Sequence, residues 1–139
     1  MRFAVLLFLA FVIACSGKTA TAPDTASLRF VPRVPEPGGA HAVTAEAGLG
    51  QITVRSILAG PDPCRTLEGE LEQRGRDLTL RVFIRPSGAG VCVQVVGRFA
   101  YDAVIEGLPS GKYALQVFHT YPSTGWPTGA VLSQTVDVR

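Results

Sequence analysis

Cysteine and histidine are the residue types with the widest chemical repertoire in this 139-residue chain, and there are few of them. Thiolates and imidazoles bind zinc, and an adjacent cysteine and histidine can act as a nucleophile and its base. The three cysteines form no C-x-x-C pair, and neither histidine stands beside a carboxylate or another histidine in the sequence. We therefore expect no metal site and no catalytic thiol. The residues concerned are Cys15, Cys64, Cys92, His41 and His119.

Other kinds of catalysis also lack their usual residues. No serine lies in a G-x-S-x-G motif, and the acidic residues are scattered along the chain. His119 continues the inward-facing alternation that starts at Tyr113, so we expect it to close one end of a core with a hydrogen bond. The sequence therefore predicts neither an enzyme nor a cofactor. An enzyme would need a concave site with convergent polar groups beside His41 or His119.

The charged residues indicate a solvated surface. Lys and Arg number 13 and Asp and Glu 11, and no basic cluster is interleaved with aromatic residues, so a nucleic-acid partner is not expected. Glu68, Glu70 and Glu72 alternate along one predicted strand and therefore share a face. We expect that face to be solvated, and calcium binding is the alternative left open.

The N-terminus has the pattern of an export signal. A positively charged start, Met1-Arg2, precedes an unbroken apolar run over residues 3–14. At 1.5 Å per residue the run spans roughly 18 Å, well short of the ~30 Å hydrocarbon core of a membrane. A short apolar run that ends in a small residue is typical of a cleaved secretory signal, which we place at residues 1–14.

The end of that signal, Val12-Ile13-Ala14-Cys15, resembles the lipobox of bacterial lipoproteins. The resemblance implies that Cys15 opens the mature chain, carries diacylglycerol on its thiol and is acylated, as with palmitate, at its amino end. Two or three acyl chains would hold the protein durably on a membrane of the cell envelope without spanning it. Ser16 at the next position favours the outer membrane if the source is Gram-negative. The alternative is an ordinary signal with an incidental cysteine.

Lipidation of Cys15 would leave two cysteines for other work. Cys64 and Cys92 are then expected to form a disulfide, because the compartment beyond the membrane is oxidising. A bridge of this span should stabilise the fold by roughly 3 to 4 kcal/mol.

Residues 15–27 are predicted to be the lipidated cysteine and a flexible tether, since residues 16–27 contain no apolar side chain larger than alanine. Residues 28–139 are the size of one domain and show period-two alternation, most clearly over 77–85. Further strands are expected at 51–58, 67–73, 91–96, 99–106, 112–120 and 131–138, with one or two more near 28–31 or 41–47, and hairpin turns at 73–77 and 87–90. This pattern predicts an all-β, antiparallel sandwich of about seven to nine strands with one disulfide.

The stretch "GLPSGKYALQV" (107–117) resembles the tyrosine corner of immunoglobulin-like and fibronectin type III sandwiches, and a similar turn of prealbumin-like bacterial modules. The resemblance implies an immunoglobulin-like fold in which the Tyr113 hydroxyl bonds an upstream backbone group. Leu115 stands where antibody domains have a cysteine, so the Cys64–Cys92 pair is not their usual inter-sheet bridge.

The connection "HTYPSTGWPTGA" (119–130) carries Tyr121 and Trp126 among Pro, Thr and Gly. Aromatic residues on such a loop can anchor a partner, which makes these two a candidate binding loop. The alternative is that Trp126 folds back over the open end of the core. "YPSTGW" also resembles a loop of chagasin-type inhibitors of papain-like proteases, although Tyr121 replaces their asparagine and their Arg-Pro-Trp loop does not follow.

Three functions are therefore expected in order of preference. The first is a lipid-anchored, non-catalytic binding or structural module that meets an unknown protein or glycan of the envelope. The second is an inhibitor of a protease or of a wall-degrading enzyme. The third is a carbohydrate-binding module that stacks sugars on Tyr121 and Trp126.

Overall fold

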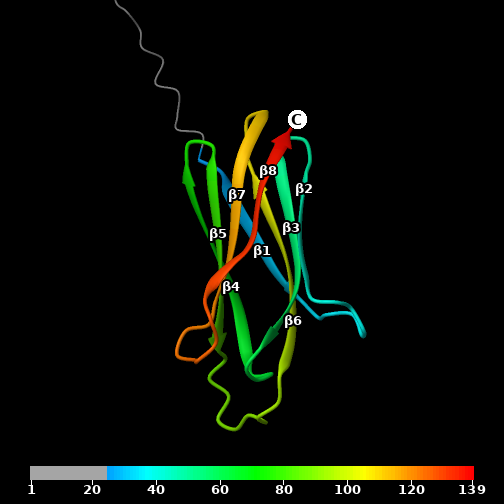
Figure 1. Ribbon diagram of the computed structural model, residues 1–139, viewed down its shortest axis with the longest axis vertical. Coiled ribbons are helices and arrows are strands. Elements are labelled where there is room, and N and C mark those ends of the chain that lie inside the picture. The colour runs from blue at the N-terminus through cyan, green and yellow to red at the C-terminus, as the bar shows by residue number, and fades with distance from the viewer. Residues whose placement is uncertain (1–24) are drawn as a thin grey trace, which may run out of the picture.

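The computed structural model describes residues 25–139, and all regular structure in this part of the chain is β-strand. The predicted signal peptide (1–14), Cys15 and most of the tether lie outside the described residues. The strands, labelled in Figure 1, are β1 (Ser27–Arg33), β2 (Ala42–Ala47), β3 (Gln51–Gly60), β4 (Arg65–Arg74), β5 (Asp77–Pro86), β6 (Gly97–Glu106), β7 (Gly111–Thr120) and β8 (Gly129–Val138).

The strands form two four-stranded sheets that enclose one core. One sheet has the order β1-β6-β3-β2 and the other β4-β5-β7-β8. The predicted all-β sandwich is confirmed. Every strand pair is antiparallel except β5 and β7, which are parallel, with Leu80 opposite Val117. The parallel pair arises because the strand between them, β6, lies in the other sheet, so the chain crosses over twice and returns in the same direction.

Period-two alternation explains why these segments become strands. In β5 the residues Leu78, Leu80, Val82 and Ile84 are almost fully buried, whereas the intervening side chains face outward. The inward side chains of β3, β6 and β7 meet them from the opposite sheet and from the neighbouring strand. Burial of a Val, Leu or Ile side chain contributes about 1.5 to 3 kcal/mol, so this shared core is the main source of stability.

The strand predicted at residues 91–96 is wrong. Residues 87–96 instead form an irregular connection from β5 to β6, and the 87–90 stretch is no hairpin turn. The chain must leave one sheet for the other here, and the bond between Cys92 and Cys64 ties the segment outside both sheets. The turn predicted at 73–77 does join two paired strands, β4 and β5, with Gly75 at a φ of 60°.

At one edge of the sandwich the ring of Phe30 packs against the backbone of Gly69 and closes the space between the two sheets. Phe30 of β1 packs its ring flat over Gly69 of β4, so that a Cβ at position 69 would lie 2.7 Å from Cγ of Phe30. This space exists only because residue 69 has no side chain. The close approach joins the two sheets at the edge where β1 and β4 face each other.

We expect Gly69→Ala to lower the free energy of unfolding by about 1 to 3 kcal/mol, because the methyl group forces the Phe30 ring to move. The measurement is urea unfolding followed by fluorescence or circular dichroism. Gly129→Ala is the matched control, since a Cβ there meets no atom within 4 Å. Equal midpoints for the two variants would contradict the packing described.

The turn before β7 contains the bond that the tyrosine-corner resemblance implied. The Tyr113 hydroxyl donates to the carbonyl oxygen of Pro109 at 2.8 Å, and the tyrosine ring is buried. The Arg76 guanidinium lies over the same ring, 5.0 Å from its centroid. The ring therefore fills the core while its polar end satisfies a carbonyl of the turn.

Tyr113→Phe is expected to lower the free energy of unfolding by about 1 kcal/mol, because the Pro109 carbonyl loses its partner while the ring packing is kept. Denaturant melts of the two proteins at the same pH make the comparison. An unchanged midpoint would mean that water replaces the hydroxyl without cost.

Candidate functional site

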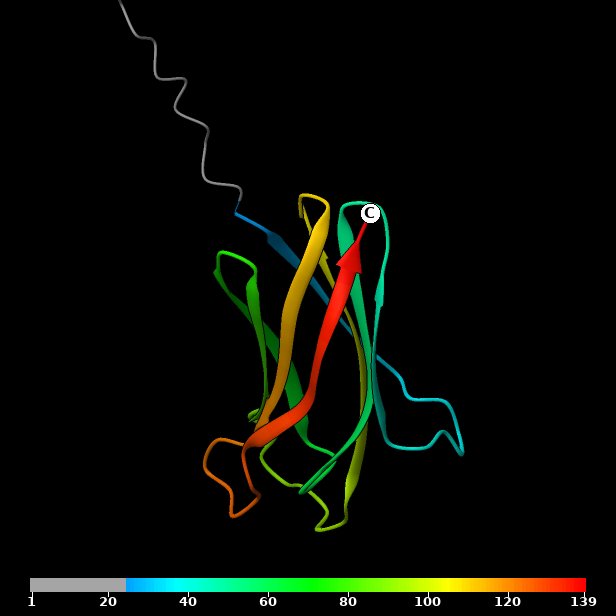
Figure 2. The same ribbon diagram turned by 45° about the horizontal axis from the view of Figure 1, so that its top comes forward.

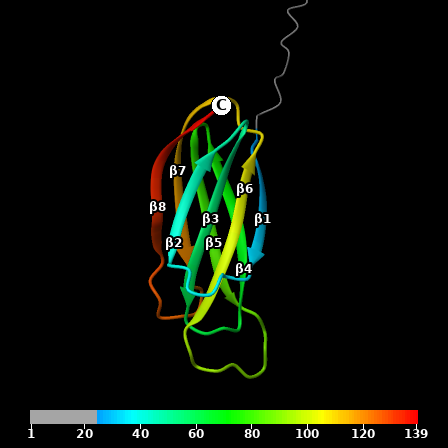
Figure 3. The same ribbon diagram turned by 90° about the vertical axis from the view of Figure 1, so that its right-hand side faces the viewer.

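Four connections lie towards one end of the sandwich, here called the loop end: residues 34–41, 61–64, 87–96 and 121–128. The strand registers place them together, since Gly60 lies opposite Gly97 and Arg65 opposite Pro86. Figures 2 and 3 show the 87–96 connection in yellow-green and the 121–128 connection in orange at the lower end, with the C-terminus at the upper end. Ser27, near the first described residue, lies opposite Glu106 and so at the upper end too.

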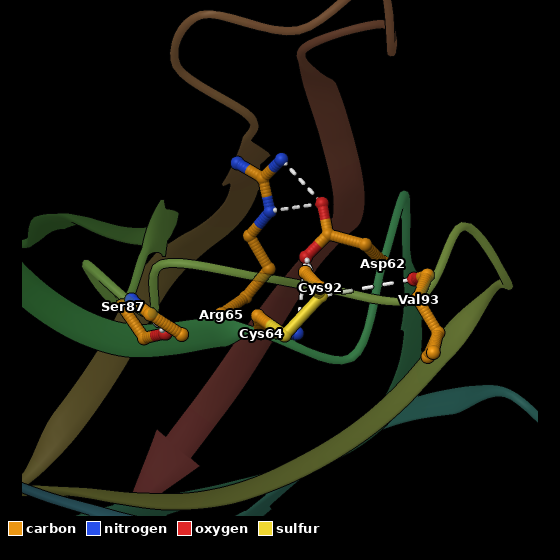
Figure 4. Close-up of a disulfide and its surroundings, with 7 residues drawn as sticks. Asp62, Cys64, Arg65, Ser87, Cys92 and Val93 are labelled. Atoms are coloured by element: carbon orange, nitrogen blue, oxygen red, sulfur yellow. Dashed lines mark hydrogen bonds and ion pairs between the residues drawn. A yellow bond between two sulfur atoms is a disulfide. The ribbon is translucent and has the colours of Figure 1, made fainter.

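The disulfide predicted from the cysteine count is present at the loop end. Cys64 and Cys92 are bonded, with their Cα atoms 6.0 Å apart and 28 residues between them in sequence. Figure 4 shows the bond beside the side chain of Asp62. Because each cysteine lies on or beside a crossing between the sheets, the bridge ties the two crossings together.

Asp62 organises the surroundings of the bridge. Its carboxylate accepts hydrogen bonds from Nε and Nη2 of Arg65, at 2.8 and 2.5 Å, and from the backbone N–H of Cys64 at 3.0 Å (Figure 4). The hydrogen bonds from Arg65 are the main reason that the pKa of Asp62 is lowered. Sequence reasoning missed this pair, for which the only signal was the spacing of Asp62 and Arg65 around Cys64.

Asp62 and the two cysteines are the described residues that come close enough together to be considered as metal ligands. An Asp62 oxygen and the two sulfur atoms lie within 4.8 Å of one another. The sulfur atoms are bonded to each other, however, and a disulfide offers no thiolate to a metal ion. The calcium alternative meets a different obstacle, because Glu68 and Glu72 form ion pairs with Arg85 and with Arg74 and Arg81.

The two aromatic residues of the candidate binding loop lie together but have different surroundings. Tyr121 packs against the core, and its hydroxyl donates to the Ala59 carbonyl at 3.1 Å. Trp126 packs on Tyr121 with ring centroids 5.3 Å apart and remains partly exposed. A turn held by Thr124, which donates to the Tyr121 carbonyl and accepts from the Trp126 N–H, sets this arrangement.

His119 lies beneath this loop, inside the core. Its Nε2 is 3.1 Å from the hydroxyl of Tyr101, and the two residues are 5% and 0% exposed. Burial lowers the pKa of His119 to about 4 and raises the pKa of Tyr101 well above its ordinary value. At neutral pH His119 is therefore an uncharged hydrogen-bonding partner of Tyr101.

A small hollow of about 280 Å³ opens beside His119 and is lined mainly by Tyr121, Trp126 and the start of β8. The hollow can accept an apolar or ring-shaped group. No carboxylate lines it, so general acid–base chemistry by paired carboxyl groups has no place there. His41 is exposed just before β2, which lies in the other sheet from the β7 strand that carries His119.

Comparison with protein-family models, with curated proteins and with solved structures gives no match to this chain. Within residues 25–139 there is no helix of the length and apolar character that crossing a bilayer requires.

Proposed function

We propose that this protein is a lipid-anchored, non-catalytic binding module of the cell envelope that presents its loop end to a partner. The observation that carries the proposal is the separation of the two ends (Figure 2). Ser27 enters the sandwich at the end opposite residues 61–64, 87–96 and 121–128. A chain anchored through Cys15 would hold the loop end away from the membrane, where a partly exposed Trp126 is free to make contacts.

The anchor is tested in the cell. Cys15→Ala should release the protein from the membrane fraction or leave an uncut precursor, and mass spectrometry of the wild-type N-terminus should find an acylated cysteine. Ser16→Ala is the control, since the neighbouring residue carries no lipid. A free thiol at Cys15 in the membrane-bound wild-type protein would end this half of the proposal.

The loop end is tested separately on a chain that starts at Ser16, which retains every described strand and the whole core. Trp126 is the one tryptophan of the chain, so its fluorescence reports directly on binding at the hollow. Trp126→Ala should abolish binding to a partner captured from envelopes, whereas Leu49→Ala, an exposed residue at the opposite end, should not. A partner retained by Trp126→Ala would remove this loop from the function.

The hollow favours a carbohydrate ligand as the second candidate, because Trp126 offers an aromatic face to a sugar ring. A glycan array with the wild type and Trp126→Ala distinguishes this use. The inhibitor hypothesis rests on the resemblance of "YPSTGW" alone, and a screen against papain-like proteases and wall-degrading enzymes with the same two proteins tests it.

We also propose that the sandwich is immunoglobulin-like in ancestry. The bond between Tyr113 and Pro109 supports this relation. The parallel pairing of β5 with β7 departs from the antiparallel sheets of that fold.

A further inference from the structure

The segment with the most exposed apolar side chains is Val91–Val96, here called the valine segment, within the connection from β5 to β6. Val91 is 93% exposed, and Val93, Val95 and Val96 are 58 to 63% exposed. Exposed single apolar residues are ordinary, but four valines within six residues form a continuous feature. The segment is fixed at one point by the bond from Cys92 to Cys64.

The backbone of the valine segment is also unpaired. The connection makes one backbone hydrogen bond, from the Ser87 N–H to the Cys64 carbonyl, and it lies outside the segment. Among the described residues no N–H or O–H group donates to residues 91–96, and their own N–H groups find no acceptor. The segment is irregular, with bends at residues 94 and 95, and it combines β-branched side chains with free backbone donors and acceptors that an added strand could pair.

Charge is missing from the valine segment and from its neighbours in sequence. Residues 86–97 contain no Asp, Glu, Lys or Arg, and neither do residues 113–136, where His119 is buried. Asp62 is neutralised by Arg65. The exposed charges that remain near this end are Arg98, whose guanidinium donates to the Gly39 carbonyl, and Glu36 in the connection from β1 to β2. The valine segment itself offers no charge for an ion pair.

A lipid surface and a protein strand are the two occupants that suit uncharged apolar side chains. Lipid cannot satisfy free backbone N–H and C=O groups, each of which is costly to bury in hydrocarbon. A partner strand hydrogen-bonds the backbone groups along one edge of the segment and places its own side chains beside the valines. The unpaired backbone therefore favours a protein strand.

We propose that the strand is the valine segment of a second copy, paired antiparallel to the first about a two-fold axis. The sequence VCVQVV has the features of a self-pairing segment: four of its six residues are valine, which has high β-propensity, and it contains no charge, proline or glycine. Pairing the segment with itself brings no like charges together. A two-fold axis places the same surface on both copies and closes the assembly at a dimer.

The dimer should be weak. Six residues of strand extend about 20 Å, and such a contact buries less than the ~1,000 Å² of a stable interface. A common membrane anchor would raise the local concentration of the two copies. The pairing itself does not depend on the anchor, so the proposed function and this inference can fail independently.

The experiment is sedimentation velocity on the purified chain from Ser16, over a series from about 10 μM to 1 mM, where weak interfaces are populated. We expect a monomer that converts to a dimer within the series. Val93→Lys should weaken association at least about tenfold, because the two-fold axis brings two lysines together. Leu49→Lys is the matched control, since it adds the same charge at an exposed apolar position of the other end and should leave association unchanged.

Hydrogen exchange measured by mass spectrometry tests whether the backbone takes part. The amides of residues 91–96 should gain protection at high concentration in the wild type and not in Val93→Lys. A melting curve checks that the variant is folded, and Val95→Lys repeats the test at a second position. A monomer at every concentration, a dimer unaffected by both substitutions, a dimer without protection of 91–96, or binding of the segment to uncharged phosphatidylcholine vesicles would overturn the proposal.

Discussion

Removal of the Cys64–Cys92 bridge is expected to lower the free energy of unfolding by about 3 to 4 kcal/mol, the largest single effect that the fold predicts. The bridge closes a loop whose ends are 28 residues apart, and so restricts the unfolded chain. In the folded state it also holds the 87–96 connection, whose backbone has little other support. Loss of the bridge therefore lowers the free energy of the unfolded state and raises that of the folded state. Both changes reduce the free energy of unfolding.

The measurement compares thermal melts of the chain from Ser16 with and without a reducing agent. A domain of this size should lose on the order of 10 °C or more in Tm on reduction. The double variant Cys64→Ser/Cys92→Ser is the control, because its melting curve should match the reduced wild type and should not respond to the reducing agent. A wild-type curve that is the same in both conditions would contradict the proposed contribution.

Acid is expected to weaken the fold through His119. The pKa of this residue is about 4 in the folded state and about 6.5 when unfolded, because burial disfavours the charged ring. Between these values the unfolded chain binds the proton and the folded chain does not, so stability falls as the pH drops from about 7 to about 4. The full effect corresponds to about 3 kcal/mol, and below pH 4 it no longer grows.

Urea unfolding at a series of pH values measures this slope. His119→Gln should flatten it between pH 7 and 4.5, because the amide can still bond the Tyr101 hydroxyl but does not titrate. His41→Gln makes the same substitution at the exposed histidine and is the control. Asp62 adds a further loss only at lower pH, as its own pKa is lowered. A wild-type curve with no slope above pH 4.5 would count against the buried neutral histidine.

The sequence allowed the strands to be predicted wherever side chains alternate and the backbone is free to pair, as in β5 and β7. The prediction was wrong at residues 91–96, although they have the same local pattern. These residues connect β5 to β6, which lie in different sheets, so the chain crosses between the sheets here and forms no strand. The Tyr113 bond to Pro109 spans four residues and could be inferred from the turn. Long-range contacts such as Tyr121 to Ala59, Tyr101 to His119 and the parallel pairing of β5 with β7 depend on how distant segments come together. These contacts cannot be predicted from the residue pattern of any one segment.

The pairing of β1 with β6 has a consequence for how the chain reaches its final state. A polypeptide emerges from the ribosome with its N-terminus first, so Ser27 appears long before its partner Glu106. The edge strand β1 cannot be fixed in its sheet until β6 has been made, and contacts so far apart in sequence form slowly. The strand synthesised first must therefore wait for the sixth, and until then its backbone can pair with other chains.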